Sequence, residues 1–521
     1  MTKLNDVNTT DIVDAIRLGC RTMSNLFNAD TGDIPFFDIV ARPEAKMSYC
    51  PHTSEAHVPG RFLNAMLTAE DIVGIKLDEL AVEKLTRAAF LAYEGTLPLP
   101  LNRNEIGGRP VNFGPHNLRE GFHALYALVK YRDSQPARKL AEAGIDSVFK
   151  YWDPSDGWDY QRLESEHEIV VDKPSTFLSG LSRSIGPLAK YYGATDYGPA
   201  LDLAIALKEK AIDEFFPEDG AYQEAHGVHC HSTTCVMSSL AQLADLTSDS
   251  TLLNRVKAFY DNGLWEVRDA LGWSIETLLP GEQYGRGEAN NTGDILETAL
   301  ILGRWGYSEY YHDAERILRG HLLPSQLRDV SFITDTPNPE NEDGRRDVAN
   351  RIKGAFGFPA PYGHQPVNLS LVKFNADIVG GTVASLCEAY QHVTCFERAG
   401  HWVNLLFDHE TTDIKVESPY THSALAITLK RPGPLFLRFP PWVDLAALKY
   451  EGITGQPRES NGHMLFSTPP INRAIIIEPP LAEQEIRLKN PAGTIRVRLE
   501  GDRVTAMDNF GADLTFFDSI D

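Results

Sequence analysis

A unit of two helices recurs along the middle of the chain, and it is the feature that most restricts the fold. In each copy, a helix rich in small residues is followed by a polar turn and by a second helix. The turns lie at Asp133, Asp196, Asp249 and Ser308, which are separated by 63, 53 and 59 residues. A repeat of about this length with two helices per unit is typical of stacked helical hairpins. The sequence therefore predicts a closed toroid of hairpins, with the first helix of each pair on the inside.

The predicted inner helices cover residues 117–131, 175–192, 232–245 and 292–305. Each begins at a residue type that caps helices well, and these residues are Asn117, Ser175, Ser232 and Thr292. In an inner ring these N-termini meet at one end, which we call the mouth. The polar side chains that we expect there are His116, Lys173, His231, Asn290 and Asn291. A toroid of helical hairpins with a polar mouth is an architecture that handles sugars.

The pattern changes from helical to alternating after about residue 395. Segments such as 412–418 and 423–430 alternate apolar and polar residues, are rich in β-branched side chains and are separated by turn residues at short intervals. This pattern is typical of an antiparallel β-sandwich. We therefore expect a mainly α protein with a β domain. Residues 1–395 would form an (α/α)6 barrel with an N-terminal arm, and residues 396–521 a β-sandwich.

Composition narrows the classes of function. With 521 residues, of which 42% are hydrophobic, the chain can bury one large core and a smaller domain. A net charge of −23 without a basic stripe argues against binding to nucleic acid or to an anionic membrane surface. No apolar run approaches 18 residues and no signal peptide is visible, so we expect a cytoplasmic protein without a membrane partner. The sequence leaves homo-oligomerisation open.

An acidic, glycine-rich segment at residues 281–299 is the first candidate site. Its charged and aromatic members are Glu282, Tyr284, Arg286, Glu288, Asp294 and Glu297. Carboxylates in an acidic cavity can have their pKa values pushed apart, which gives one acid and one base. We predict Glu282 as a catalytic acid, with Tyr284, Arg286, Asp294 and Glu297 binding substrate. The alternative is that Asp294 and Glu297, which share a helix face, only stabilise the first turn of a helix.

Histidines form a second candidate site at residues 226–235, where His226, His229 and His231 alternate with Cys230 and Cys235. The composition suggests zinc, but the spacing fits no standard zinc pattern. We predict instead that His231 faces the cavity as a hydrogen-bonding group, like His116 in its own repeat; a structural histidine is the alternative.

Asp377 is the third candidate, because it stands just ahead of a helix predicted at 381–393, in the place that His116 and His231 occupy in their repeats. A carboxylate there would project into the same mouth. The alternative is an acid that only favours the start of a helix.

Four motifs follow one another in an order that resembles the bacterial β-L-arabinofuranosidase family. They are G-E-Q-Y-G followed by D-I-L-E-T-A within 281–299, a small-residue helix at 381–390, W-V-N-L-L-F at 402–407 and L-F-L-R-F-P-P-W-V at 435–443. The resemblance covers roughly residues 110–485. It implies a retaining glycosidase with an (α/α)6 barrel and a β-sandwich, in which Glu282 is the acid/base and Glu297 is a zinc ligand.

The chain departs from that family at its cysteines. The cysteine of the family's E-T-C motif is Ala299 here. The family's Cys-Cys pair, which supplies a thiolate nucleophile and zinc ligands, falls at Asp377-Ile378 or at Ile378-Val379. Without these thiolates we reject zinc chemistry, and we predict neither a metal nor another cofactor. Asp377 would instead attack the anomeric carbon or activate water.

We therefore expect a glycoside hydrolase that acts on a short oligosaccharide or glycoside, with Glu282 and Asp377 as its catalytic pair. Two alternatives stay open. One is a polysaccharide lyase or sugar epimerase on the same toroid, in which His116, His231 or Tyr284 abstracts a proton. The other is a sugar-binding protein that lost its activity with the cysteines, and that would bind sugar without turnover.

Overall fold

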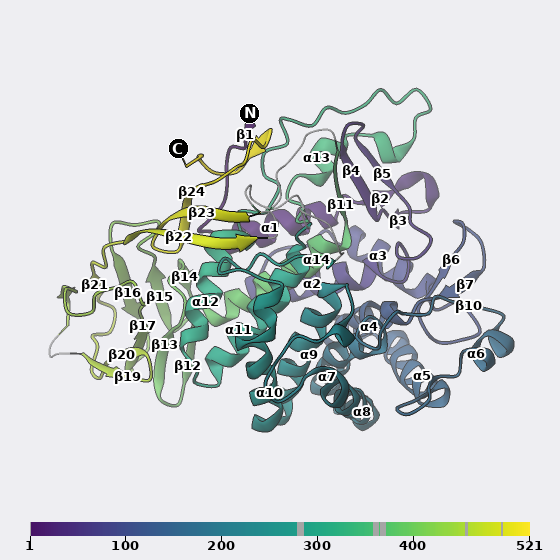
Figure 1. The fold of residues 1–521 in the computed structure, drawn as a ribbon, viewed down its shortest axis with the longest axis horizontal. Coiled ribbons are helices and arrows are strands. Elements are labelled where there is room, and N and C mark those ends of the chain that lie inside the picture. Colours follow the sequence, from purple (N-terminus) through teal and green to yellow (C-terminus); the bar gives the residue numbers. More distant parts are fainter. Residues whose placement is uncertain are drawn as a thin grey trace.

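The computed structural model of the chain describes residues 2–278, 286–357, 364, 371–453, 457–490 and 493–520. Within these ranges the protein is mainly α with a β part, as the sequence predicts. Helices dominate up to His392 and strands dominate from Thr394 onward, so that the two kinds of structure lie largely side by side (Figure 1).

Six helices of the described chain contact one another in cyclic order and enclose a narrow lumen. In that order they are α2 (Val58–Val73), α4 (Leu118–Arg132), α7 (Ile185–Thr195), α9 (Cys230–Thr247), α11 (Ala289–Arg304) and α14 (Asp377–His392). The last of them, α14, packs against the first, α2, and so closes the ring.

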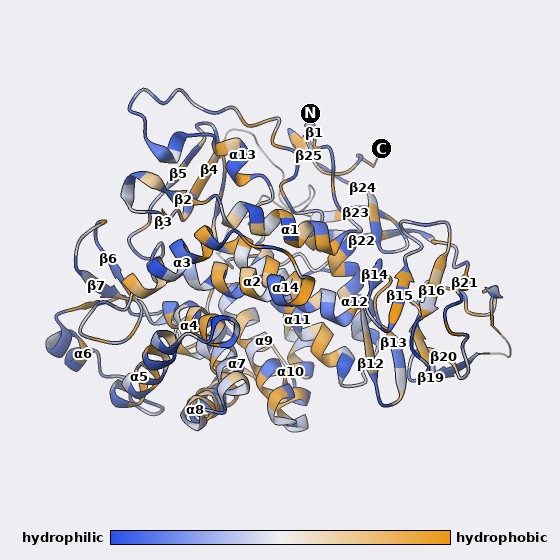
Figure 2. Ribbon diagram, turned by 180° about the vertical axis from the view of Figure 1, so that it is seen from behind, coloured by the Kyte–Doolittle hydropathy of each residue, from blue (hydrophilic) through white to orange (hydrophobic). Residues whose placement is uncertain are grey.

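A second layer of helices covers the ring. The outer partners of the six inner helices are, in the same order, α3 (Glu79–Leu91), α5 (Gln135–Tyr151), α8 (Gly198–Phe215), α10 (Ser250–Asp261), α12 (Glu309–Ile317) and α1 (Ile12–Met23). The outer helices α5 and α8 carry both hydrophilic and hydrophobic residues (Figure 2), whereas α9 and α11 are buried along most of their length. This difference follows from position, because an outer helix faces both the core and solvent.

The predicted hairpin turns are confirmed at all four positions. Asp133 and Asp196 end α4 and α7 in the left-handed region, with φ of 47° and 56°. Short polar side chains of this kind tolerate that conformation. Asp249 caps α10 by accepting a hydrogen bond from the Leu252 backbone N–H at 2.9 Å, and Ser308 stands at the N-cap of α12.

The predicted start of the second inner helix is wrong. Ser175 does not cap a helix there, because the side chain and backbone of Ser179 bond to Thr176 in a local turn. A 3-10 turn at Leu181–Ser184 follows, and α7 begins only at Ile185. Hydroxyl side chains compete for backbone groups in this way, and that is why they mark turns as readily as caps.

Two further predicted caps lie inside helices instead of at their starts. The N-cap of α9 is His229 and that of α11 is Glu288, so Ser232 and Thr292 fall in the first turns. Their hydroxyls bond elsewhere, Ser232 with the His229 ring at 2.8 Å and Thr292 with the Gly272 carbonyl at 2.8 Å. Helix α14 likewise begins at Asp377, four residues before the predicted start. These corrections place His229 and Glu288 at the mouth.

Two five-stranded sheets follow the ring. The first consists of β12 (Thr394–Glu397), β13 (Gly400–Val403), β17 (Leu435–Arg438), β20 (His463–Phe466) and β19 (Arg458–Ser460). The second consists of β14 (His409–Glu410), β15 (Ile414–Glu417), β16 (Leu425–Leu429), β21 (Ile475–Ile477) and β18 (Tyr450–Glu451). Leu435 and Leu437 of the first sheet share one buried hydrophobic cluster with Val416 and Ile427 of the second. All pairings are antiparallel except β13 with β17.

The end of the chain returns to the helices. A third sheet of β22 (Glu483–Asn490), β23 (Gly493–Glu500) and β24 (Arg503–Met507) places its apolar side chains in the helical core instead of in the cluster between the two sheets. Strand β25 (Leu514–Thr515) then pairs in parallel with β1 (Thr2–Lys3), so the two ends of the chain lie together (Figure 1).

Glycines allow the inner helices to approach closely near the mouth. A Cβ atom on Gly60 of α2 would lie 1.8 Å from the carbonyl oxygen of Glu120 in α4. A Cβ atom on Gly380 of α14 would lie 2.7 Å from the carbonyl oxygen of Arg61 in α2. Only glycine fits either position. The two contacts fix the backbone at Arg61 and Glu120, whose side chains belong to the candidate site.

We expect Gly60→Ala to lower the free energy of unfolding by about 1–3 kcal/mol or more, because the added methyl group must displace the backbone of α4. The matched control is Gly198→Ala at the first turn of α8, where a Cβ would meet no atom within 4 Å. Chemical denaturation of the two variants checks this. Equal stabilities would show that the spacing of α2 and α4 adapts without cost.

Candidate functional site

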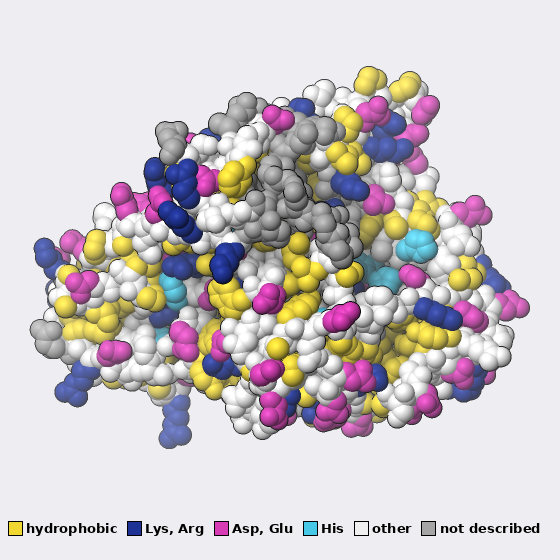
Figure 3. Space-filling model, viewed as in Figure 1, with side chains coloured by type: hydrophobic (Ala, Val, Ile, Leu, Met, Phe, Trp, Pro, Cys, Tyr) yellow, Lys and Arg dark blue, Asp and Glu magenta, His cyan; other side chains and the backbone are white. Residues whose placement is uncertain are grey.

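Charged side chains gather at the N-terminal ends of the inner helices, and each inner helix or the turn before it contributes at least one of them. We call this set the mouth cluster. Its members are His57, Arg61, Arg119, Glu120, Arg183, His229, His231, Glu288, Asp294 and Asp377. All are buried except His229, which is partly exposed. Histidine side chains are visible in a depression on the face of the molecule shown in Figure 3.

Asp377 is held at the first residue of α14 by His57. The Oδ2 atom of Asp377 lies 3.2 Å from His57 Nε2, and His57 Nδ1 lies 3.1 Å from Asn117 Oδ1. Burial raises the pKa of Asp377, but the hydrogen bond from His57 and the charges of His57 and Arg61 outweigh it, so the pKa is lowered. Asp377 is therefore an ionised carboxylate with one buried oxygen, Oδ1, that has no hydrogen-bond partner among the described residues.

Glu120 stands at the centre of the mouth cluster and is fully buried. Its Oε1 lies 3.1 Å from Arg61 Nη2, 3.4 Å from Arg119 Nη1 and 3.7 Å from Arg183 Nη2. Its Oε2 lies 3.4 Å from His57 Nδ1. Burial raises the pKa of Glu120, but these four groups together bring it well below its usual value. Arg119 Nη2 also lies 3.6 Å from Asp294 Oδ1, so the three guanidinium groups share more than one carboxylate.

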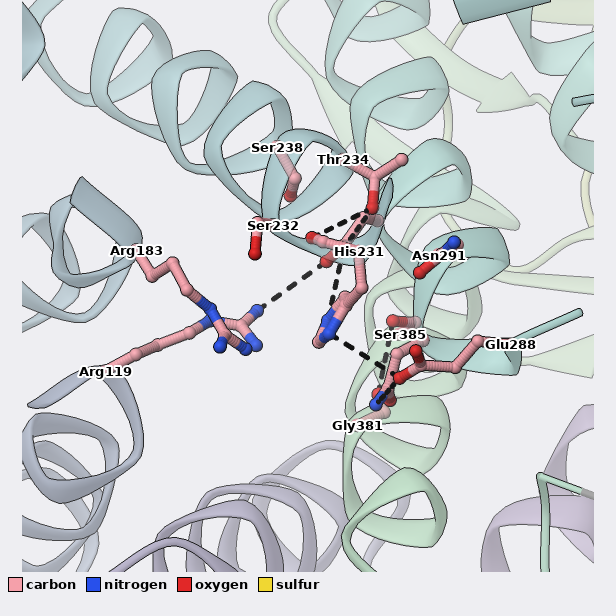
Figure 4. Close-up of polar contacts among 12 residues, drawn as sticks. Arg119, Arg183, His231, Ser232, Thr234, Ser238, Glu288, Asn291, Gly381 and Ser385 are labelled. Atoms are coloured by element: carbon pink, nitrogen blue, oxygen red, sulfur yellow. Dashed lines mark hydrogen bonds and ion pairs between the residues drawn. The ribbon is translucent and has the colours of Figure 1, made fainter. Parts of the chain in front are cut away.

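His231 lies opposite the arginines, between two further carboxylates. Its Nδ1 is 3.5 Å from Glu288 Oε1 and its Nε2 is 3.6 Å from Asp294 Oδ2. Figure 4 shows His231 and Glu288 facing each other, with Arg119 and Arg183 reaching toward them from the other side of the lumen. Burial and the charges of the arginines bring the pKa of His231 well below its usual value, so the imidazole is neutral.

The two carboxylates beside His231 titrate at unusually high pH. Burial, and then the charges of Glu276 and Asp377, raise the pKa of Glu288 to about 8. Burial raises the pKa of Asp294 to about 7, although Arg119 opposes the shift. Near neutral pH Glu288 is therefore protonated while Asp377 is ionised. A proton donor and a carboxylate base in one mouth are the two groups that acid–base chemistry on a sugar requires.

Four of the side chains that were predicted to bind or act on substrate lie at the mouth. His231, Asp294 and Asp377 belong to the mouth cluster, and His116 lies beside it. The ring of His116 lies 6.3 Å from that of His57, and burial together with the Arg183 charge lowers its pKa to about 3. Lys173 is not among them, because it is exposed and stacks 4.9 Å above the ring of Tyr160.

The other predicted residues divide into two groups. Arg286 lies beside the mouth cluster, with its Nε 3.2 Å from Glu276 Oε2. Glu297 follows Glu288 by nine residues on α11, so it lies about 13 Å further along the helix. Its carboxylate accepts hydrogen bonds from Ser238 at 2.9 Å, Gln242 at 3.0 Å and Ser385 at 2.7 Å. Glu297 thus lies one turn beyond Asp294 along the lumen, and it lines the same narrow space as Asp294, Arg61 and Arg119.

Glu282 and Tyr284 fall outside the described residues, so their predicted roles stay predictions. The chain on either side of them is placed beside the mouth. The Leu278 backbone N–H donates to the Val228 carbonyl at 2.8 Å, and that of Glu276 donates to the Arg286 carbonyl at 2.7 Å.

Sequence reasoning missed five members of the mouth cluster: His57, Arg61, Arg119, Glu120 and Arg183. Three of them, His57, Arg61 and Arg183, lie in or just before α2 or in the turn before α7. Neither α2 nor that turn was predicted at its true position. A usable signal was present at Arg119 and Glu120. Both stand within the first turn of a helix whose other members are mostly apolar, directly after the predicted cap Asn117. Charged side chains buried in an inner helix need a functional or pairing role.

Comparison with solved structures shows a distant resemblance to the GH127 β-arabinofuranosidases. One GH127 β-arabinofuranosidase aligns over 96% of this chain and 83% of its own, with a TM-score of 0.57 and 14% identity. A GH127 β-L-arabinofuranosidase from Geobacillus stearothermophilus T6 aligns over 94% and 80%, with a TM-score of 0.55 and 15% identity. A sugar epimerase from a ruminal bacterium aligns over 73% of this chain and 99% of its own, with a TM-score of 0.52 and 10% identity.

At these identities the likeness is one of fold. No protein-family model matches the sequence, and no curated protein matches it. None of the helices in the described part of the chain combines the length and the apolar character that crossing a lipid bilayer requires.

Where the family that the sequence resembles carries zinc-site cysteines, this chain has Ala299 and either Asp377-Ile378 or Ile378-Val379, so no thiolate is available at those positions. Among the described residues, one group of three possible ligands has its donor atoms within 4.8 Å of one another, namely His229, His231 and Glu288. Both imidazoles are neutral, as a metal ligand must be. The guanidinium groups of Arg61, Arg119 and Arg183, which lower the pKa of His231, oppose a divalent cation at the same place.

We therefore expect purified protein to contain far less than one zinc per chain. Elemental analysis after dialysis checks this, with His229→Ala as a matched variant that removes one of the three possible ligands. About one zinc per wild-type chain that is lost in His229→Ala would contradict the prediction and assign the metal to these three residues.

Proposed function

We propose that the chain is a carbohydrate-active enzyme, and that it hydrolyses a short oligosaccharide or glycoside at the mouth of an (α/α)6 toroid that precedes a β-sandwich. The observation that carries the proposal is the opposite protonation of two buried carboxylates: Glu288, with a pKa raised to about 8, and Asp377, with a lowered pKa. The likeness of fold to β-arabinofuranosidases adds support.

Each group has a role in this proposal. Glu288 donates its proton to the glycosidic oxygen that leaves, and the free Oδ1 of Asp377 attacks the anomeric carbon or takes a proton from an attacking water. His57 positions Asp377 and keeps it ionised. His116 and His231, with the guanidinium groups nearby, hydrogen-bond the sugar hydroxyls. The neutral His231 also keeps Glu288 and Asp294 apart.

The separation of the two carboxylates at the anomeric carbon would decide the stereochemistry. A separation of about 5–5.5 Å leads to a covalent glycosyl-enzyme and to retention. A separation of about 6.5–9.5 Å leaves room for a water molecule and leads to inversion. We propose inversion. The thiolate that attacks directly in the family that the sequence resembles is absent here, and the Asp377 carboxylate, at the first residue of α14, can act as a base on water instead.

Glu282 remains the rival proton donor. The family resemblance assigns it that role, whereas Glu288 is supported by its burial and its raised pKa. Both glutamates are close in sequence, and each can be replaced by glutamine with little change in volume. The two assignments can therefore be separated by kinetics.

We expect Glu288→Gln to reduce kcat/KM by roughly 10²–10⁴-fold on a glycoside with an alkyl leaving group, and far less on an activated aryl glycoside. Only the alkoxide needs protonation as it leaves. Glu282→Gln serves as the matched variant, and initial rates on both substrates are the measurement. If Glu282→Gln shows the leaving-group dependence and Glu288→Gln does not, Glu282 is the acid. Small and equal losses in both variants would refute both assignments.

The pH profile of kcat/KM should be level from about pH 5 to 7 and should fall above about pH 8. Glu288 must carry its proton, and its raised pKa of about 8 sets the alkaline limb. Asp377 must be ionised, and since its pKa is lowered from 3.8, the acid limb lies below about pH 4. Glu288→Gln should lose the alkaline limb. An alkaline limb that persists unchanged in this variant would assign it to another group.

A sugar epimerase is the second candidate, and a specific observation favours it. Neutral His231 lies between two carboxylates and His57 contacts a third, so the mouth holds two histidine–carboxylate pairs that can move protons. The fold is also similar to that of a sugar epimerase. Incubation of free sugars with the protein in D2O tests the epimerase, which would leave carbon-bound deuterium in the sugar. Incubation with oligosaccharides tests cleavage: hydrolysis gives products without a C=C bond, whereas a lyase gives a product whose new C=C bond absorbs in the ultraviolet.

A further inference from the structure

Strand β22 is a free edge of the third sheet. The strands of this sheet lie in the order β22, β23 and β24, and within the described chain β23 is the only helix or strand that runs closely along β22 (Figure 1). With 8 residues, β22 is long for an edge strand. An edge of this kind presents backbone N–H and C=O groups that can pair with another chain.

The backbone groups at this edge belong to every second residue of β22. The Gly501 N–H donates to the Ala482 carbonyl at 2.9 Å, so Ala482 faces β23. In an antiparallel ladder alternate residues face the same neighbour, and the register between β22 and β23 is continuous. The odd-numbered residues therefore point their N–H and C=O groups away from β23, and no hydrogen bond from the rest of the described chain reaches those groups. These residues are Glu483, Glu485, Arg487 and Lys489.

The side chains of these four residues are exposed and form a row of two acids followed by two bases, which we call the edge row. Figure 3 shows Lys and Arg side chains over this sheet. Glu483 lies opposite Glu500 of β23, and Arg487 lies opposite Arg496. Like charges directly opposite each other destabilise a strand pair. The β23 member of each pair has an opposite charge of its own in or just after β24, whereas Glu483 and Arg487 have no ion pair within the described chain.

The other two members of the edge row also have room for an opposite charge. Lys489 lies opposite Thr494 and has no carboxylate within 4 Å among the described residues. Glu485 lies 3.7 Å from Arg498, and both side chains are about half exposed. A single chain therefore leaves most of the edge row without a partner of opposite sign.

We propose that a second copy of this chain pairs with β22 along this edge, antiparallel and about a two-fold axis at Ile486, so that the two sheets become one. In this register Glu483 faces the partner's Lys489, and Glu485 faces the partner's Arg487. Each ion pair occurs twice because the interface is symmetric. The facing residues are all odd-numbered, so their outward backbone groups pair at the same time. On the other face of the sheet, the two Ile486 side chains meet.

The order of charges selects this register. Moving the axis by one residue along the strand would place Glu485 or Arg487 opposite its own copy. Moving it by half a residue would set exposed side chains opposite those that pack on the helical core, such as Leu488. An antisymmetric row of charges is thus complementary to itself in one antiparallel arrangement. The interface lies outside the mouth, and the proposal does not depend on the reaction proposed there.

The test is the association state of the full chain, measured by sedimentation velocity. At about 150 mM NaCl the repulsion between two chains of net charge −23 is screened beyond about 8 Å. We expect the wild-type chain to form a dimer below about 100 µM. Arg487→Glu/Lys489→Glu makes the edge row wholly acidic, and Glu483→Lys/Glu485→Lys makes it wholly basic. Each double variant should dimerise at least about tenfold more weakly than the wild type, because like charges then face each other.

Mixing the two double variants is the sharper measurement, because an acidic edge row then faces a basic one at every position. We expect the mixture to form a heterodimer that neither variant forms alone. The matched control is Lys449→Glu/Arg458→Glu, which changes the net charge as much as Arg487→Glu/Lys489→Glu does, at two exposed residues outside β22. This control should dimerise like the wild type.

Hydrogen exchange of the wild-type chain gives a readout that needs no variant. The backbone amides of the edge row should become protected as the protein concentration rises, because they bond to the partner in the dimer. A wild-type chain that stays monomeric at about 100 µM would overturn the inference. So would edge-row amides whose exchange is independent of concentration, an undiminished dimer in Arg487→Glu/Lys489→Glu, or folded double variants that stay monomeric when mixed.

Discussion

The buried carboxylate of Glu120 is the group on which the arrangement of the mouth depends. It faces three guanidinium groups and one imidazole that come from α2, α4 and the turns before α2 and α7. Burying so many charges is costly unless they are paired, so the helices must meet where the pairing is satisfied. The glycines at the α2–α4 and α2–α14 contacts permit that approach. Removing Glu120 would leave three cations without their shared partner.

This charge centre also accounts for the difference between the two candidate catalytic carboxylates. Asp377 lies next to His57 and Arg61, and their charges outweigh its burial. Glu288 is just as buried but lies near Glu276 and Asp377, so burial and like charge act in the same direction. The same lumen therefore keeps one carboxylate ionised and the other protonated. The split follows from the neighbours of each group, which are chiefly His57 beside Asp377 and the carboxylates of Glu276 and Asp377 near Glu288.

The sequence predicted the elements better than their ends. The hairpin repeat, the four turns and the change to strands near residue 395 follow from local patterns of apolar residues and turn formers. The starts of α7, α9 and α11 were misplaced, because Ser175, Ser232 and Thr292 use their hydroxyls in other contacts. His231 and Asp377 could be placed at the mouth by repeat position. Arg61 and Arg183 could not, because charge pairing between α2, α4 and the turn before α7 leaves no periodic signal.

The narrow lumen bears on the size of substrate that the proposed hydrolase would accept. Between the mouth and the C-terminal ends of the inner helices, Arg119, His123 and Asn64 line a space of about 20 Å³, which is room for about one water molecule. A sugar chain cannot pass through such a constriction. Substrate must then enter and leave by the mouth. The bond to be cleaved must lie where Asp377 and Glu288 can reach it, and this limits how far from the entrance that bond can be. That geometry favours short glycosides or chain ends over internal bonds of a polysaccharide, and it supports the proposed substrate class independently of any family resemblance.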